Sequence, residues 1–367
     1  MYYQEMLNDW LKDHVLQAPY MKDEPAFYRN IEKHLDTLRA DFRLSTAKPR
    51  WDDTVIDWAS SDFLSLNRTG RIRDAYLKEM TKHGEDWDLS AAGSRLQYGN
   101  YSYLIEVEKQ VAEFFGSETA FIGHSGFLCN VGIIGAVALP GDCYLYDELV
   151  HASTHEGMKL SRASHKVSFA HNDVLSLRLI LCNKTIRAVI MNQMRFAVYS
   201  GAPSFPMVAS IRAGIELLST GATINEQQNI QDIVAYFFEK LTTNMEWQRA
   251  KSAGLLSCPL SEGWEQRVYH THIVPIWTKP RHEQYLFFHM MSENMNAYNF
   301  AYPVVPKGKS RVRMVFHAHN TKADVDKTVS TIAEWVREML DIEQGQSAEY
   351  VPRIASEVYG MKAAVRG

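Results

Sequence analysis

Phe121–Gly157, FIGHSGFLCNVGIIGAVALPGDCYLYDELVHASTHEG, decides the predicted fold. A β-rich run at Thr119–Gly123 leads into His124-Ser125-Gly126, and an apolar helical run follows from Phe127. A strand, a glycine turn and a helix start, in this order, direct free N–H groups and the positive end of the helix dipole toward an anion. We therefore predict a phosphate site at the turn, with His151 placed to stack on a flat ring.

A second stretch, Ser90–Asn100 (SAAGSRLQYGN), carries small residues at Ala91, Ala92, Gly93 and Ser94. Small residues allow a backbone to approach a ligand closely. Glycine-serine turns before helices are common, however, so these two stretches alone do not establish a phosphate site.

Length and composition predict an ordinary globular protein. The chain has 367 residues, 46% hydrophobic and 22% charged, and a net charge of −4. This length is sufficient for two domains with cores of their own. The net charge is negative and no basic stripe stands out in the sequence, so we expect no nucleic-acid partner. No apolar run reaches the roughly 18–20 residues that span a bilayer, so no membrane span is expected.

The N-terminus and the cysteines favour a cytoplasmic protein. The first residues, MYYQEMLNDWLKDHV, contain early acids and no small-residue cleavage site, so we expect an amphipathic helix rather than a secretory signal. The four cysteines form no CxxC pair, which disfavours a zinc knuckle or a redox dithiol. Free thiols in a reducing compartment are the expectation.

Alternating helices and strands predict an α/β fold. The expected helices are Arg71–His83, Tyr103–Phe115, Phe127–Val137, His151–Ser161, Val174–Leu181, Thr185–Gln193, Phe205–Ser219, Ile230–Thr243, Glu283–Met295 and Lys322–Leu340. The expected strands are Thr119–Gly123, Cys143–Tyr146, Lys166–Ala170, Phe196–Ser200, His272–Trp277 and Arg311–Phe316. Such alternation is typical of a largely parallel sheet with a smaller α+β domain after it.

The helix at Tyr103–Phe115 has a clear apolar stripe. Its predicted inward positions are Leu104, Val107, Val111 and Phe114, and its predicted outward positions are Glu106, Glu108, Lys109 and Gln110. We divide the chain into an N-terminal helical segment at 1–55, a large domain at 56–250 and a small α+β domain at 251–367.

Short motifs spread over residues 62–321 carry a resemblance to a known family. They occur at Asp62–Leu66, Gly93–Arg95, Gly99–Asn100, Gly116–Glu118, Ser125–Phe127, Asn130–Gly132, Gly141–Asp142, Asp147–Glu148, His151–Ser153, Gly157, Leu160–Ser161, His171–Asp173, Ala202–Pro206, Pro303–Gly308, Arg311–Arg313 and His319–Thr321. In this order they resemble the α-oxoamine synthases, a branch of the fold-type-I pyridoxal-phosphate (PLP) transferases. That family includes 8-amino-7-oxononanoate synthase, 5-aminolevulinate synthase and serine palmitoyltransferase.

The resemblance implies roles for seven residues. Ser125, Gly126 and Phe127 would hold the PLP phosphate, and His151 would stack on the pyridine ring. Asn130 and Ser153 would support the pocket. Arg313 would pair with the carboxylate of an amino acid, a role that suits a bidentate guanidinium. No residue is assigned as a metal ligand.

The chain departs from the family near Leu181 and Cys182. Relatives place a segment there with an Asp-x-Ala-His motif, whose Asp holds the pyridinium nitrogen, and a motif whose Lys forms the Schiff base. Neither motif occurs in the right place in this sequence. A segment on the order of 80 residues, more than half of a typical domain, is missing by this comparison. The catalytic residues are therefore unknown, and covalent attachment of PLP is in doubt.

Two functions follow from the resemblance. One is a PLP-dependent acyltransferase or aminotransferase-like enzyme that joins an amino acid to an acyl thioester, as a cytoplasmic homodimer of fungal specialised metabolism. The alternative is a shortened homologue without turnover, produced by splicing or a wrong gene structure, or acting as a dimer partner. Whether the chain is an enzyme stays open at this point.

Two unrelated sites fit the sequence poorly. A serine-hydrolase elbow needs Gly-x-Ser-x-Gly, and Phe127 occupies the last position of Gly123–Phe127. A zinc peptidase has His-Glu-x-x-His, whereas Glu156 here follows both His151 and His155. Satisfied polar or stacking histidines are the simpler interpretation.

Overall fold

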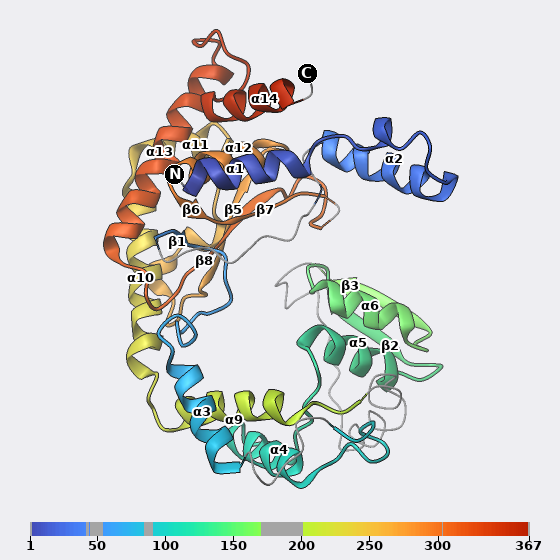
Figure 1. Cartoon of the computed structure of the whole chain (residues 1–367). Coiled ribbons are helices and arrows are strands. Elements are labelled where there is room, and N and C mark those ends of the chain that lie inside the picture. Colours follow the sequence, from blue (N-terminus) through green and yellow to red (C-terminus); the bar gives the residue numbers. More distant parts are fainter. Residues whose placement is uncertain are drawn as a thin grey trace. The chain divides into compact units, whose positions relative to one another are not determined.

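The computed structural model describes residues 2–41, 44, 54–83, 91–169, 201–302 and 304–365. The chain divides into two compact units (Figure 1). The first combines residues 1–68 with 223–367, and the second is residues 69–222. These boundaries differ from the sequence-based domains 1–55, 56–250 and 251–367, which stay a prediction.

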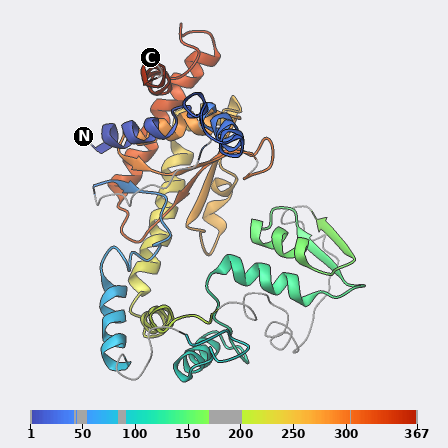
Figure 2. The ribbon, with the colours of Figure 1, turned by 45° about the vertical axis from the view of Figure 1, so that its right-hand side comes forward.

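The unit of residues 69–222 contains the predicted phosphate site. Its helices are α3 (Arg71–His83), α4 (Ser102–Phe114), α5 (Gly126–Val137), α6 (Ala152–Leu160) and α9 (Phe205–Ser219), and its strands are β2 (Cys143–Asp147) and β3 (His165–Phe169). The two strands pair in parallel, from Cys143 opposite His165 to Asp147 opposite Phe169. Figure 2 shows this pair beside α5 and α6. A parallel pair joined by a helix is the βαβ unit that the sequence predicts.

A buried cluster holds α4 against α9. Tyr103, Leu104 and Val107 of α4 pack on Phe205 and Val208 of α9. The Tyr103 and Phe205 rings meet edge to face, 4.7 Å between centroids. Such aromatic pairs stabilise a core beyond the area that they bury. This cluster supports the loop and segment that lead into α5.

The other unit is an α+β assembly. Its helical elements are α1 (Tyr2–Asp13), η1 (Ala18–Tyr20), α2 (Ala26–Ala40), α10 (Ile224–Thr243), α11 (Met245–Ser252), η2 (Pro259–Ser261), η3 (Trp264–Gln266), α12 (His282–Ser292), α13 (Lys322–Glu343) and α14 (Arg353–Val365). Its strands are β1 (Ile56–Asp57), β4 (Leu256–Ser257), β5 (Ile273–Thr278), β6 (Met295–Asn296), β7 (Tyr298–Phe300) and β8 (Arg311–Val315).

A four-stranded antiparallel sheet, in the order β4-β5-β8-β7, forms the centre of this unit. Alternate residues of its strands face opposite sides, and Val274, Ile276, Val312 and Met314 are fully buried. These four side chains share one core with α10, α12 and α13. The other face of the sheet is less buried, and it carries Arg313.

Among the described residues, each predicted helix and strand overlaps an observed element of the same type, except one strand, whereas α11, α14, β4 and β7 were not predicted. Thr119–Gly123 is not a strand. No described strand pairs with it, and instead the N–H and C=O of Ile122 bond to buried side chains. Three further predictions, at Val174–Leu181, Thr185–Gln193 and Phe196–Ser200, lie outside the described residues.

The fold confirms the predicted class: a mixed structure with parallel strand pairing and a separate α+β unit. None of the helices in the described residues combines the length and apolarity needed to cross a bilayer. The cytoplasmic location stays a prediction.

Candidate functional site

The start of α5 has the geometry of an anion-binding site. Ser125 is the N-cap residue in extended conformation, and its Oγ accepts a hydrogen bond from the Leu128 N–H at 3.2 Å. The N–H groups of Gly126 and Phe127 lie in the first turn, where a helix offers them no carbonyl partner. A Cβ added at Gly126 would meet no atom within 4 Å, and Phe127 is 45% exposed. An anion therefore has room to approach the positive end of the helix.

His151 caps the neighbouring helix α6 and joins this site. Its Nδ1 accepts from the Ser153 N–H at 3.2 Å and lies 2.8 Å from Ser153 Oγ. Asn130 Nδ2 donates to the same Oγ at 3.0 Å. Because Oγ accepts from Asn130, it directs its own proton to His151 Nδ1. The proton of a neutral His151 ring is then on Nε2.

The ring of His151 meets the ring of Phe127 edge to face, with centroids 6.3 Å apart. The structure thus brings together all six residues predicted to bind the cofactor, from the first turns of α5 and α6. Their roles toward a cofactor stay a prediction, because the geometry shows their proximity only.

Gly157 allows α5 and α6 to approach each other. A Cβ on Gly157 would lie 2.7 Å from Cβ of Ile134 and 3.2 Å from the carbonyl oxygen of Asn130. Real Cβ atoms do not tolerate 2.7 Å, so any side chain here pushes the helices apart. The hydrogen bond between Asn130 and Ser153 depends on this close approach.

A buried ion pair fixes the segment before Ser125. Arg95, whose side chain is 2% exposed, donates to Glu108 Oε1 and Oε2 at 2.8 and 2.9 Å. It also donates to Asn100 Oδ1 at 2.7 Å and to the Ile122 carbonyl at 3.1 Å, and it lies over the Phe121 ring. Glu108 Oε1 in turn accepts the Ile122 N–H at 2.7 Å.

This network corrects the predicted outward position of Glu108, since the residue is buried in α4. Helical periodicity places a carboxylate on the polar side, but the guanidinium of Arg95 offsets its cost of burial. Phe114, predicted inward, is 40% exposed. The sequence alone did not predict the buried ion pair of Arg95 and Glu108. The available signal was an arginine inside a loop of small residues.

Gly99 closes the loop that carries Arg95. A Cβ at this position would meet the Gly93 carbonyl oxygen at 2.2 Å and the Cβ of Ala202 at 2.6 Å. The Ala202 N–H donates to the same Gly93 oxygen at 2.8 Å. Gly99 therefore serves a close contact within the protein, and the predicted contact of Ala91, Ala92, Gly93 and Ser94 with a ligand stays a prediction.

Arg313 lies in the other compact unit, on β8. Its guanidinium is 4.8 Å from the Phe300 ring centroid and 5.7 Å from that of Tyr298. Burial lowers the pKa of Arg313 from its ordinary value. No described carboxylate forms an ion pair with it, so a substrate carboxylate would find an unpaired cation.

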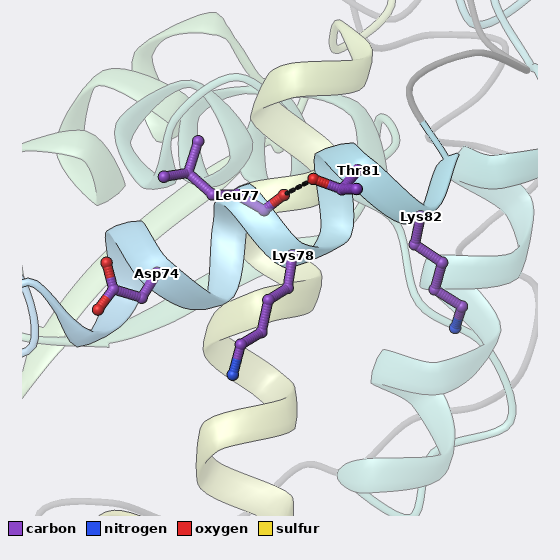
Figure 3. A pocket seen from close by; sticks show the side chains of 5 residues that line it. All are labelled: Asp74, Leu77, Lys78, Thr81 and Lys82. Carbon is purple, nitrogen blue, oxygen red and sulfur yellow. Dashed lines mark hydrogen bonds between the residues drawn. The ribbon is translucent and has the colours of Figure 1, made fainter.

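Other candidate binding sites in the described residues have less support. A hollow along α3 is lined by Asp74, Leu77, Lys78, Thr81 and Lys82 (Figure 3). All five belong to one helix, and the Thr81 hydroxyl already donates to the Leu77 carbonyl at 2.9 Å. No group of three His, Cys, Asp or Glu side chains in the described ranges could hold a metal ion.

Comparison with known proteins identifies the family. An aminotransferase class I and II family model matches residues 53–185. The aminoacyl transferase sphA of Aspergillus fumigatus is 35% identical over 456 aligned positions, which cover 97% of this chain and 97% of the relative. The 8-amino-7-oxononanoate synthase of Emericella nidulans is 25% identical over 384 positions, covering 77% of this chain and 90% of the relative.

Solved structures show the same fold. A serine palmitoyltransferase from S. paucimobilis is 14% identical with a TM-score of 0.62, covering 76% of this chain and 87% of that one. The 8-amino-7-oxononanoate synthase of Francisella tularensis is 17% identical with a TM-score of 0.57, covering 79% and 100%. Fold and alignments together define a fold-type-I PLP-dependent transferase. Within that class, the chain belongs to the α-oxoamine synthase family.

The alignment with the Aspergillus relative also supports the predicted shortening. Its 456 positions exceed the 367 residues of this chain by 89, so at least 89 aligned positions have no counterpart here. The family-model match ends at residue 185, close to the predicted gap after Leu181.

The family is PLP-dependent, and the described residues fit part of that cofactor. The open first turn of α5 suits its phosphate, and the exposed ring of His151 suits one face of its pyridine. The motifs that the family resemblance assigns to a pyridine-side carboxylate and a Schiff-base lysine are not found in this sequence. We therefore derive no catalytic step through the cofactor.

Proposed function

We propose that this chain binds pyridoxal 5′-phosphate at the start of α5 and serves a reaction that joins an amino acid to an acyl thioester. The observation that most supports this proposal is that Ser125–Phe127, Asn130, His151 and Ser153 lie close together. Bound PLP would supply an electron sink for the amino acid. Arg313 would hold the amino acid's carboxylate by paired hydrogen bonds.

Each residue has a defined task in this proposal. Ser125 orders the first turn, so that the N–H groups of Gly126 and Phe127 point outward. Ser153 and Asn130 fix the rotation of the His151 imidazole, because a hydrogen bond to Nδ1 limits the turning of the ring. A ring held in this way presents one face to a flat ligand without further loss of side-chain entropy.

The finer assignments rest on the relatives. The sphA proteins of Aspergillus fumigatus and Byssochlamys spectabilis match 97% and 98% of this chain and are named aminoacyl transferases. We therefore propose aminoacyl transfer in fungal specialised metabolism, by a homodimer as the family resemblance implies. The alternative, a homologue without turnover, gains no support from these comparisons.

PLP titration of the whole chain tests the proposal. Calorimetry should show saturable binding of PLP to the native chain. The double variant His151→Ala/Gly126→Val should bind PLP at least about tenfold more weakly, since a β-branched side chain at position 126 obstructs the anion site. Glu113→Gln, at an exposed position of α4, is the control and should bind as the native chain does. Absence of native binding would contradict the proposal.

Covalent attachment needs a separate measurement. Borohydride reduction followed by peptide mapping shows whether any lysine holds the cofactor. We expect reversible binding and no labelled lysine, because the lysine motif of the family is missing. A mapped lysine would show that the chain supplies a substitute, and it would remove the main argument for the alternative.

A further inference from the structure

The less buried face of the β4-β5-β8-β7 sheet carries two arginines side by side. Along β8, Val312 and Met314 are fully buried, whereas Arg311 and Arg313 alternate with them on the opposite face. Residues two apart in a strand are separated by about 6.6–6.8 Å. Two guanidinium groups therefore begin from neighbouring points of one surface.

Aromatic rings hold these cations in place. In register, Trp277 and Phe300 lie on either side of Arg311. Arg311 is 5.7 Å from the Trp277 ring centroid, and Lys309 Nζ is 4.3 Å from the same centroid. Arg313 packs on Phe300 at 4.8 Å. Cation–aromatic contacts of this kind orient a charged group but do not neutralise it.

Among the described residues, these cations have no counter-charge. No carboxylate of the described residues forms an ion pair with Lys309, Arg311 or Arg313. Burial lowers the pKa of both arginines. Nε of Arg313 and Nε1 of Trp277 are buried and have no hydrogen-bond partner in the part of the chain that the structure describes. Arg311 Nε donates only to the Lys309 carbonyl, at 3.0 Å.

Arg95 is a buried arginine of this protein whose positive charge is compensated by a carboxylate. There the guanidinium donates to both oxygens of a buried carboxylate. An arginine that is partly desolvated without such a partner costs stability, and an anion that binds to it removes that cost. Arg311 and Arg313 are therefore two neighbouring positive charges, and a bound anion at each would stabilise the protein.

We propose that Arg311, with Lys309 over Trp277, is a second carboxylate position beside Arg313, and that the amino-acid substrate is dicarboxylic. This rests on the proposed role of Arg313 toward the first carboxylate. The spacing along β8 suits two anions of one short molecule, such as aspartate or glutamate. A monocarboxylic amino acid leaves one guanidinium unpaired.

Calorimetry on the full chain in the presence of PLP tests this proposal, with aspartate, glutamate, alanine and glutamine as ligands. We expect the better of the two dicarboxylic amino acids to bind at least about tenfold more tightly than its neutral counterpart, as a charge-assisted hydrogen bond implies. Arg311→Gln should abolish that preference and leave alanine binding unchanged. Arg311→Lys should retain part of it.

The variants separate this proposal from the proposed function. Arg313→Gln should weaken the binding of alanine and of aspartate alike. If this variant binds alanine as the native chain does, the proposed role of Arg313 toward the first carboxylate is wrong. Lys240→Gln is the matched control, because Lys240 also lies over a ring but has Asp326 as its counter-ion. Thermal unfolding of each variant verifies that it is folded.

Two results would overturn the proposal. One is equal binding of dicarboxylic and neutral amino acids by the native chain, or a preference that survives Arg311→Gln. The other is obtained with N-acetylcysteamine thioesters of succinate and butyrate. If Arg311→Gln selectively weakens the succinyl thioester and not aspartate, the second carboxylate belongs to the acyl donor.

Discussion

Removal of Arg95 should destabilise α4 and the segment that leads into the phosphate site. Arg95→Met keeps the length and apolar stem of the side chain but leaves the Glu108 carboxylate buried without its cation. Glu108→Gln has the converse effect, because it leaves a buried guanidinium with neutral acceptors only. In both variants the group that remains has almost no access to water.

The expected cost follows from burial. Breaking a buried ion pair from one side costs about 3–5 kcal/mol of unfolding free energy. For a domain of this size, this corresponds to a fall in melting temperature of roughly 6–20 °C. The double variant Arg95→Met/Glu108→Leu should cost no more than either single variant, since it leaves no uncompensated charge.

Hydrogen exchange of the Ile122 amide is the local readout, because this N–H donates to Glu108. We expect faster exchange in both single variants, together with weaker PLP binding at Ser125. Glu113→Gln is the control: it breaks an exposed pair with Lys109 on the same helix, worth at most about 0.5 kcal/mol. Single-variant costs below about 1 kcal/mol, or a double-variant cost equal to their sum, would refute the reasoning.

Two further predictions concern the packing of α5 and a buried histidine. Gly157→Val should force α6 away from Ile134, lower the free energy of unfolding by about 1–3 kcal/mol and weaken PLP binding. The control Ser161→Ala, at the end of α6, should bind PLP as the native chain does. Equal PLP affinities of the two variants would contradict this prediction. Burial, with Arg68 and His317 nearby, lowers the pKa of His319 to about 4 from 6.5. The neutral ring therefore stabilises the fold above pH 6.5, and this stabilisation, up to about 3 kcal/mol, is lost as the pH falls toward 4. Urea unfolding across this range should show the slope in the native chain and a smaller slope in His319→Gln.

Periodic patterns predicted the helices well because their cause is local. Phe205–Ser219 has the predicted bounds, and α4 begins and ends one residue before the prediction. Each helix satisfies its own backbone hydrogen bonds, so an apolar stripe of sufficient length is nearly enough to place it.

The errors arose where a partner far along the chain decides the outcome. Thr119–Gly123 has the composition of a strand, but a strand requires a neighbour, and side chains of Arg95 and Glu108 bind Ile122 instead. Glu108 was placed outward because periodicity cannot detect an arginine 13 residues away in a loop. The candidate site residues were predicted from the family resemblance, which encodes contacts that spacing alone does not show.

The surroundings of α5 explain why the site fits only part of its cofactor. This helix is apolar on all sides, yet Ala136 is its one buried residue. Such a helix normally lies inside a larger core, and a two-stranded parallel sheet such as β2–β3 normally has further strands beside it. The Aspergillus relative has at least 89 aligned positions more than this chain, and the family-model match stops at residue 185, soon after β3. Among the described residues, the sparse cover of α5 and the two-stranded extent of the β2–β3 sheet agree with the predicted shortening of the chain near Leu181.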